Sequence, residues 1–396
     1  MKKFKQLVFS VMLLFVASFG FSQVTSSAIT GTVKDNKGLT VPGASVEVIH
    51  KPSGTKYFAT TGMTGNFGVP AIRPGGPYTV KVSFINYKTS VIDDVTAPLG
   101  NAVNLNVTLA EESSVLSEVV VKTTIKNNII SKNRTGASQS FSNRELNAVP
   151  IIGSRSIKSI TKYNANGDGS NFGGQDARLN NFTIDGSVFN NGFGLGNDSQ
   201  AGGRTGSTAI SLDAIEQLQV NIAPFDVRQS GFLGAGVNAV TRSGTNEFQG
   251  SVYTSNRNNS ASYLGNKAGD LIVNSSPFTE SIFGARIGAP IIKNKLFIFA
   301  NFEKIDNVSP ATPWTTTGSP NGGSQVTAAN YSDLTTVSAL ANQLGYQTGP
   351  FERYDAISKS FKYLIRLDWN INDNNKLTDP IVNRDLHIEQ IIYYYH

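Results

Sequence analysis

Apolar and polar residues alternate along most of this chain with a period of two, the pattern typical of β-strands with one buried face. Between residues 29 and 109 the alternating segments, such as 78–84 and 103–109, are separated by clusters of Gly, Pro, Asn and Asp. About seven strands in roughly 85 residues match the usual spacing of ~8 to 12 residues per strand and turn. The pattern therefore predicts a small β-sandwich.

The sequence of this segment resembles a known module. Residues 31–48 read GTVKDNKGLTVPGASVEV, residues 61–69 read TGMTGNFGV and residues 75–88 read GGPYTVKVSFINYK. These stretches resemble the carboxypeptidase regulatory-like domain, which implies a transthyretin-like or carbohydrate-binding-like sandwich over residues 23–110, without catalytic residues of its own. His50 is the only histidine before residue 387, and a zinc site normally needs at least three protein ligands. We expect no metal here.

Residues 111–144 lack a sustained apolar period and read as a polar linker. Within it, LSEVVVK is similar to the segment that precedes the plug in outer-membrane receptors driven by the energy-coupling protein TonB. A short β-branched run in a tether can add as a strand to a partner's sheet edge, which makes Glu118, Val119, Val120 and Val121 a candidate TonB box. Equally, these valines could form the first strand of the plug or close the sandwich.

The stretch that follows, residues 145–246, carries the strongest resemblance. Residues 144–157 (RELNAVPIIGSRSI), 179–192 (LNNFTIDGSVFNNG) and 211–246 resemble the plug of a TonB-dependent receptor. Ser211 is placed to cap a helix in which Leu212, Ile215 and Leu218 form an apolar stripe. Strands are then expected at 218–222 and 237–241. We expect a mixed α/β plug domain.

Longer alternating segments begin after residue 246. In residues 361–371 the apolar side chains fall on one face and the polar ones on the other, with Leu364 as the one exception. These eleven residues match the ~9 to 11 that a tilted transmembrane strand requires. Weaker strands are expected at 248–257, 281–289 and 296–305, and the connections alternate between long and short as in outer-membrane barrels. A soluble β-sandwich with one exposed loop would also alternate.

Only about four such strands are visible in residues 247–378, whereas TonB-linked transporters form barrels of about 22 strands. Residues 379–396 (DPIVNRDLHIEQIIYYYH) lose the alternation and read as an aberrant tail. We therefore expect an incomplete transmembrane β-barrel, cut short by a frameshift near Thr378. Alternating strands encoded downstream in another reading frame would support this expectation.

Composition and charge narrow the class further. Residues 1–22 have lysines, an apolar run and small residues in the order of a secretory signal peptide, so we expect export and cleavage near Gln23. Removing this segment takes away three lysines and no acid, which lowers the formal net charge from +6 to +3 and gives no reason to expect nucleic-acid binding. The absence of cysteine excludes disulfides and thiolate chemistry.

The fold class we expect is thus mainly β, with a sandwich, a plug and the first strands of a barrel. The resemblance is closest to the Oar-like subset of TonB-dependent receptors of the Bacteroidetes type, located in the outer membrane. It implies energy-coupled uptake of an unidentified ligand, with TonB, its inner-membrane energising complex and outer-membrane lipid as partners. A secreted β-sandwich adhesion or binding protein without transport is the alternative.

We expect no enzymatic activity, catalytic residue, cofactor or metal site. In the plug, the loop at 190–204 is a candidate ligand-facing element. Its candidate contacts are Asn190, Asn191, Asn197, Asp198 and Arg204.

Overall fold

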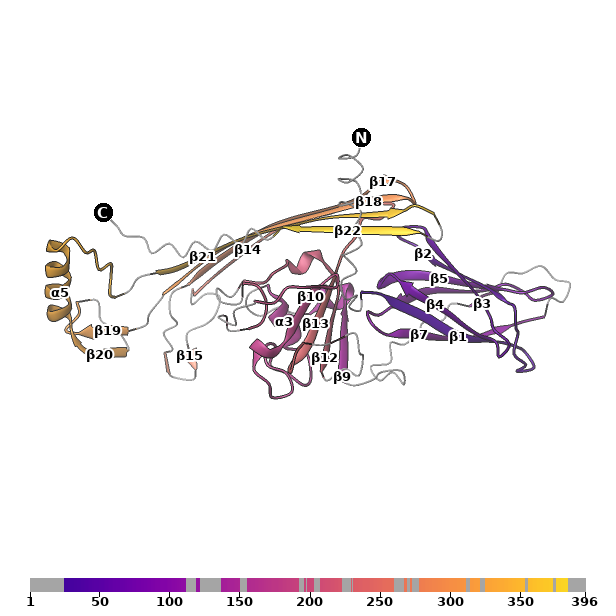
Figure 1. Ribbon diagram of the computed structural model, residues 1–396, viewed down its shortest axis with the longest axis horizontal. Coiled ribbons are helices and arrows are strands. Elements are labelled where there is room, and N and C mark those ends of the chain that lie inside the picture. Colours follow the sequence, from indigo (N-terminus) through magenta and orange to yellow (C-terminus); the bar gives the residue numbers. More distant parts are fainter. Residues whose placement is uncertain are drawn as a thin grey trace, which may run out of the picture. The chain divides into compact units, whose positions relative to one another are not determined.

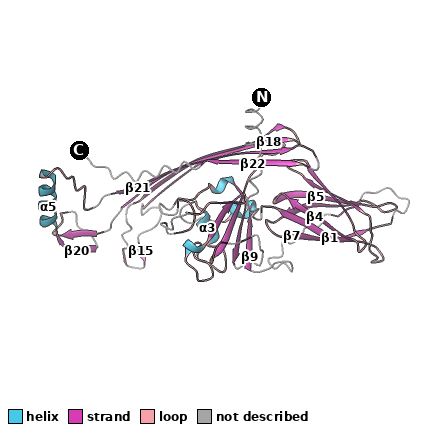
Figure 2. Ribbon diagram, viewed as in Figure 1, coloured by secondary structure: helices cyan, strands magenta, loops and turns pink. Residues whose placement is uncertain are grey.

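The computed structural model is built mostly of strands, with a few short helices (Figure 2). It describes residues 25–111, 119–121, 137–149, 155–191, 196, 198–202, 207–222, 229, 231–259, 267–268, 271–272, 278–310, 314–320, 325–352, 355–372 and 375–383. Two compact units divide the chain: one contains residues of 1–249, 287–300 and 364–382, and the other contains residues of 250–286, 301–363 and 383–396. No helix in the described residues is long and apolar enough to cross a membrane.

The N-terminal segment forms the expected sandwich of seven strands, drawn from indigo to purple in Figure 1. The strands are β1 (Ser27–Asp35), β2 (Ser45–His50), β3 (Thr55–Thr60), β4 (Asn66–Ile72), β5 (Gly75–Ser83), β6 (Ser90–Ala97) and β7 (Ala102–Leu109). One sheet has the order β4-β1-β7, and the other has the order β3-β2-β5-β6-β8, where β8 is Val119–Val121.

The alternating apolar residues of both sheets meet in one core. Ile29, Val46, Val80 and Val82 in this core are fully buried. Burying such a side chain contributes roughly 1.5–3 kcal/mol each, so the period-two pattern is what holds the two sheets together. The core also contains Tyr78, whose hydroxyl donates to the carbonyl oxygen of Arg73 at 2.5 Å.

The plug is a five-stranded sheet with short helices around it. Its strands are β9 (Ala137–Ser142), β10 (Asn181–Ile184), β11 (Ser187–Val188), β12 (Ile215–Ile222) and β13 (Ala235–Thr241), in the order β11-β10-β13-β12-β9. Its helices are α2 (Asn143–Ala148), α3 (Ile157–Thr161) and the 3-10 turns η1 (Ala177–Leu179) and η3 (Leu212–Ala214). The hairpin from β10 to β11 turns at Asp185 and Gly186, both at positive φ, as a tight two-residue turn requires.

Two expectations for the plug were wrong in their details. The predicted helix at 212–218 is only the 3-10 turn η3, capped by the Ser211 side chain, and Ile215 and Leu218 lie on strand β12. Spacings of three residues fit a helical stripe, but here the antiparallel pairing of β12 with β13 and β9 prevails. The plug sheet also begins earlier than expected, at Ala137, inside the predicted linker. The alternation did not reveal this strand, because β9 is mostly polar and buries only Phe141.

After the plug, five long strands form a sheet in chain order (Figure 1). They are β14 (Gln249–Asn258), β17 (Thr279–Ile292), β18 (Leu296–Pro310), β21 (Asp355–Asn370) and β22 (Lys376–Asn383). The first four coincide with the four predicted strands, and three of them run further than predicted. Strand β22 continues to Asn383, so it includes Pro380 and passes the Thr378 boundary of the expected tail.

The long connection between β18 and β21 has structure of its own. It contains β19 (Trp314–Thr317), which pairs in parallel with β20 (Gln325–Asn330), and the helix α5 (Tyr331–Gln343). The carboxylate of Glu352 accepts hydrogen bonds from the backbone and hydroxyl of Thr316 and from the hydroxyl of Ser319. The connection between β14 and β17 contains the short pair β15 (Lys267–Ala268) and β16 (Leu271–Ile272).

Candidate functional site

The core of the plug includes two residues from the long strands. Phe299 of β18 and Leu364 of β21 are buried in the same cluster as Phe182, Leu218 and Val237 of the plug sheet. Leu364 is the one apolar residue on the polar face of its strand, and its packing explains that exception. The polar face of β21 therefore faces the plug at this point.

A cluster of four charged side chains and one threonine lies where the plug, the sandwich and strand β21 meet. We call it the junction cluster, and it consists of Arg73, Asp185, Thr241, Arg366 and Asp368. Arg366 donates from Nη1 to the carbonyl oxygen of Thr241 at 2.8 Å and to its Oγ1 at 2.9 Å. The same nitrogen lies 3.4 Å from Asp185 Oδ1, and Nε lies 3.0 Å from Asp368 Oδ2.

The sandwich enters this cluster through Arg73, the residue that follows β4. Its Nη2 lies 2.7 Å from Asp368 Oδ1, and its Nη1 donates to the hydroxyl of Ser243. Two guanidinium groups thus face two carboxylates in a buried setting. Breaking such a buried pair by removing one partner costs about 3–5 kcal/mol, because the remaining charge is left unpaired away from water.

A second link joins the sandwich to the plug through one amide side chain. Gln217 on β12 accepts from the backbone N–H of Leu99 at Oε1, 2.6 Å away, and donates from Nε2 to the carbonyl oxygen of Ala97 at 3.1 Å. Ser140 of β9 donates to the carbonyl oxygen of Leu99 at 3.4 Å. Gln217 therefore binds the chain at the end of β6 through both of its polar atoms.

Further contacts bind the sandwich to the short turns at the ends of the long strands. The backbone N–H of Asn246 donates to the carbonyl oxygen of Pro52 at 2.8 Å. Asn370 Nδ2 donates to Thr55 Oγ1 at 2.9 Å, and the Lys376 ammonium lies 3.3 Å from the centre of the Tyr57 ring. One face of the sandwich thus covers the end of the sheet where these turns lie.

Within the other unit, the sheet has one polar face. Glu303 on β18 lies 3.0 Å from Lys362 Nζ on β21 and accepts from the hydroxyl of Tyr253 on β14 at 2.5 Å. Arg257 and Glu280 form a further pair at 3.3 Å. Glu303 and Lys362 are buried, so these charges are paired across neighbouring strands and not simply solvated.

The opposite face is apolar and exposed. Aromatic rings pack edge to face across three strands, with Phe302 on β18 in contact with Phe283 on β17 (centroids 6.2 Å apart) and with Phe361 on β21 (4.8 Å). Along β21, Ile365, Leu367 and Trp369 continue this face with 37–46% exposure. An exposed apolar face with aromatic residues opposite a polar face is the pattern of a transmembrane barrel wall.

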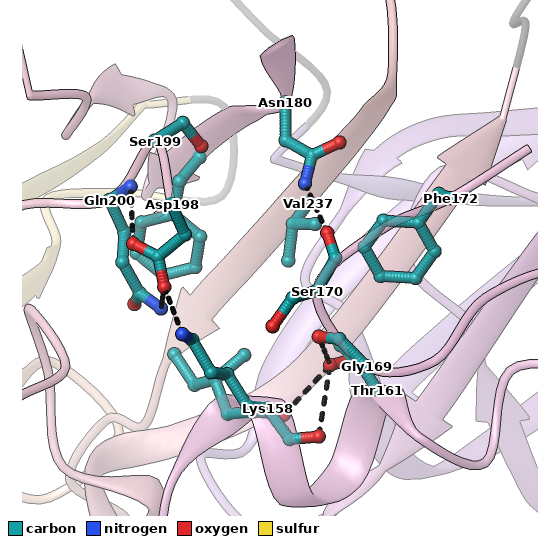
Figure 3. Close-up of a pocket in the computed structure, with 12 residues that line it drawn as sticks. Lys158, Thr161, Gly169, Ser170, Phe172, Asn180, Asp198, Ser199, Gln200 and Val237 are labelled. Carbon is teal, nitrogen blue, oxygen red and sulfur yellow. Dashed lines mark hydrogen bonds and ion pairs between the residues drawn. The ribbon is translucent and has the colours of Figure 1, made fainter. Parts of the chain in front are cut away.

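A small cavity in the plug lies between α3 and the loops that follow it (Figure 3). Lys158 Nζ lies 2.6 Å from Asp198 Oδ2, and Gln200 Nε2 donates to the same oxygen at 3.2 Å. The cavity volume is about 30 Å³, which is enough for water but far below the ~300 Å³ of a ligand pocket. The cavity is therefore part of the plug's packing.

The predicted ligand-facing residues are only partly described. Asn197 and Arg204 lie outside the described residues. Asp198 is buried in the ion pair with Lys158, so its carboxylate is turned inward. Asn190 bonds back to the plug sheet, since its Oδ1 accepts from the N–H of Phe182 at 2.7 Å, while the N–H of Asn191 donates to the carbonyl oxygen of Ser199 at 2.5 Å. Ligand contact by these residues stays a prediction.

The candidate TonB box is also placed in part. Glu118 lies outside the described residues. Residues Val119, Val120 and Val121 form β8, which pairs in parallel with Ser90–Ile92 of strand β6. Of the alternatives considered for these valines, they close the sandwich sheet, and the first strand of the plug is β9. Their role as a TonB-binding segment stays a prediction.

No group of three or more His, Asp or Glu side chains that could hold a metal ion occurs within the described residues. His50 is buried at the end of β2, where its Nδ1 lies 2.6 Å from Ser53 Oγ. Burial, followed by the positive charge of Arg73, lowers the pKa of His50 to about 3. The histidine is therefore neutral and belongs to the packing of the sandwich.

Sequence reasoning missed the junction cluster and Gln217. The sequence predicts Gln217 in a helix and Gln219 and Asn221 at the polar positions of the strand that follows, yet all three side chains are 2–5% exposed. Arg366 and Asp368 are predicted on the polar face, but nothing in their spacing reveals Arg73, almost 300 residues earlier. The only sequence feature that pointed to this cluster was a pair of opposite charges two residues apart, Arg366 and Asp368, on the same face of the predicted strand.

Comparison with known proteins agrees with this architecture. Residues 28–110 match the carboxypeptidase regulatory-like domain, and residues 240–359 match an outer membrane beta barrel domain. A segment similar to an outer membrane beta barrel domain therefore follows a segment similar to the carboxypeptidase regulatory-like domain.

The chain is also similar to a TonB-dependent transporter. It is 26% identical over 387 residues to the TonB-dependent transporter Oar of Myxococcus xanthus, covering 92% of this chain and 34% of Oar. The chain thus spans about a third of the length of the curated relative it matches.

Solved structures of two outer-membrane proteins are also similar. The transporter YddB of Escherichia coli has 10% identity and a TM-score of 0.39 over 60% of this chain and 31% of its own. The siderophore receptor PirA of Acinetobacter baumannii has 17% identity and a TM-score of 0.38 over 62% of this chain and 31% of its own.

Proposed function

We propose that this chain is the plug-bearing part of an energy-coupled outer-membrane transporter. The observation that carries the proposal is the shared core in which Phe299 and Leu364 of the long strands complete the plug. This packing fixes the plug against the polar face of the sheet. A plug in that position blocks a pore until it moves, and TonB, powered by its inner-membrane complex, would supply the work.

In this proposal the tether between sandwich and plug transmits the force. TonB would pair with the segment at Glu118, Val119, Val120 and Val121 by strand addition, in which main-chain hydrogen bonds provide most of the affinity. The junction cluster suits a reversible contact, because its guanidinium and carboxylate groups regain hydrogen bonds to water when they separate. A purely apolar contact would have no such compensation.

The ligand would bind from outside, at the long connections and the plug loop that contains Asn190, Asn191, Asn197, Asp198 and Arg204. For Asp198 this requires the plug to rearrange, since its carboxylate is paired with Lys158. The proposal includes no catalytic step, cofactor or metal.

The alternative is a secreted adhesion or binding protein that does not transport. The exposed apolar face along β21 and the match to an outer membrane barrel domain favour the transporter. Membrane fractionation separates the two functions, since the alternative requires a folded product that remains soluble without detergent.

Depletion of compounds from the growth medium tests the proposal even while the ligand is unidentified. Cells with the intact full-length gene are compared with a gene knockout and with a variant whose residues 117–121 are replaced by a Gly-Ser segment. We expect at least one compound to be removed from the medium by the first strain alone. A compound removed equally well by the Gly-Ser variant would show that uptake does not depend on this segment, and no difference among the three strains would refute transport.

A further inference from the structure

The position of β8 in the sandwich sheet suggests how the coupling segment is presented. In the sheet order β3-β2-β5-β6-β8, β8 is the last strand. Its backbone pairs with β6 on one side, in the register Ser90 with Val119, Val91 with Val120 and Ile92 with Val121. In the part of the chain that the structure describes, no strand pairs with its other side.

The beginning of β6 has the burial of an inner strand. Ser90, Val91 and Ile92 are consecutive, so their side chains point to alternate faces of the sheet, yet all three are at most 9% exposed. The backbone of β6 pairs with β5 on one side and with β8 on the other, so β6 is an inner strand and β8 is the outer one.

A free edge on an already extended strand is a site for strand addition. The outer side of an edge strand presents a row of unpaired N–H and C=O groups. Fixing the backbone of a residue costs conformational entropy, and β6 already holds the three residues of β8 extended, so that cost is not added when a partner binds.

We propose that the sandwich displays residues 119–121 as an edge strand, and that TonB adds its own strand to the outer side of β8 while β8 stays on β6. This inference rests on the proposed function, since it assumes that this segment binds TonB. It assigns the sandwich a specific role: it is the template of the TonB-binding surface. In the alternative arrangement, pairing with β6 hides the segment from TonB, and TonB binds only after β8 has separated from β6.

Strand β6, which holds β8, also contacts the plug at its other end. Ala97 ends β6, and its carbonyl oxygen accepts from Gln217 of the plug sheet, while the nearby N–H of Leu99 donates to the same side chain. A partner bound at β8 is therefore one strand away from β12. Displayed on β6, the coupling segment has a path to the plug sheet through hydrogen bonds as well as through the covalent tether.

A disulfide that ties β8 to β6 distinguishes display from hiding. The chain contains no cysteine, so the double variant Val91→Cys with Val120→Cys can form one disulfide only. Directly paired strand residues meet the Cα separation of about 4.4–6.8 Å that a disulfide needs. The affinity of the purified periplasmic domain of TonB for the intact chain in detergent is measured with the disulfide oxidised and reduced, with each single cysteine variant as control.

We expect the disulfide to form readily and the oxidised chain to bind TonB within threefold of the reduced chain or more tightly. Oxidised binding weakened more than threefold and restored by reductant would show that β6 hides the segment. Failure of the disulfide to form would refute the pairing itself.

A synthetic peptide of residues 112–136 separates this inference from the proposed function. If neither the peptide nor any form of the chain binds TonB, the coupling role of the segment is refuted. If the peptide binds and the oxidised chain does not, only the display is refuted.

Discussion

His50 shows how a single buried residue makes the sandwich sensitive to pH. Its Nδ1 is bonded to Ser53, whose hydroxyl lies 2.7 Å from that of Thr55, and its ring lies 4.9 Å from the ring of Tyr78. The pKa is lowered to about 3 by burial and by the charge of Arg73, whereas an unfolded histidine has a pKa of 6.5. The folded sandwich therefore excludes a proton that the unfolded chain accepts.

This difference predicts a loss of stability in acid. Above pH 6.5 both states are neutral at His50 and the stability is at its full value. As the pH falls from 6.5 towards 3, the free energy of unfolding decreases with a slope that approaches about 1.4 kcal/mol per pH unit, the amount that one additional proton in the unfolded state implies. Pulse proteolysis in urea measures the free energy of unfolding of the sandwich at each pH. The substitution His50→Gln should remove most of its slope between pH 6.5 and 5. An unchanged slope in the variant would assign it to other groups.

At the scale of elements, the alternation of apolar and polar residues located most strands along the sequence, but it did not show which strands pair with each other. Strands of the sandwich and of the long sheet were predicted because their apolar faces are continuous. The helix at 212–218 was wrong because Leu212, Ile215 and Leu218 fit a helical spacing and a buried strand equally well. Strand β9 was missed because it has one apolar anchor, Phe141, and its other partners lie about 80 residues away on β12.

Glycines in β17 provide a test of how the strands fit together. A Cβ at Gly284 would overlap the ring of Tyr253, whose hydroxyl bonds Glu303. A Cβ at Gly288 would lie 3.5 Å from Phe299 Cδ2, an ordinary contact. We expect Gly284→Ala to destabilise the protein by about 1–3 kcal/mol, the usual cost of overpacking, and Gly288→Ala to change it little.

Urea midpoints in detergent micelles measure both glycine variants. Adding Tyr253→Ala to Gly284→Ala should make the combined loss smaller than the sum of the two single losses, since the clash disappears. Equal losses for the two glycine variants would contradict this account of the strand contacts.

At the scale of the whole molecule, the junction cluster predicts that the sandwich is docked on the plug and on strand β21, and that the ion pair of Arg73 stabilises this docked state. The backbone contact between Pro52 and Asn246 brings the sandwich within disulfide reach of the end of the plug. In a chain without native cysteines, Pro52→Cys with Asn246→Cys should therefore oxidise readily. Adding Arg73→Gln should slow this oxidation about tenfold or more, since breaking a buried ion pair costs several kcal/mol and each 1.4 kcal/mol is a factor of ten.

The control for Arg73 is an exposed pair on the same sandwich. Lys37 lies 2.8 Å from Glu111, but both side chains are more than half exposed, and such pairs contribute little. Lys37→Gln should leave the rate of disulfide formation unchanged. If both substitutions slow the reaction alike, the effect is one of general sandwich stability and the junction cluster does not hold the docked state.

The position of Phe299 and Leu364 in the plug core affects the order in which the protein can fold. The plug residues precede both side chains in the chain, so during export the complete plug reaches the periplasm before the strands that finish its core. Until those strands fold, part of the apolar core that contains Phe182 and Leu218 is exposed to water. A periplasmic holdase that recognises exposed apolar surface would bind there, and it would be released when the strands complete the core.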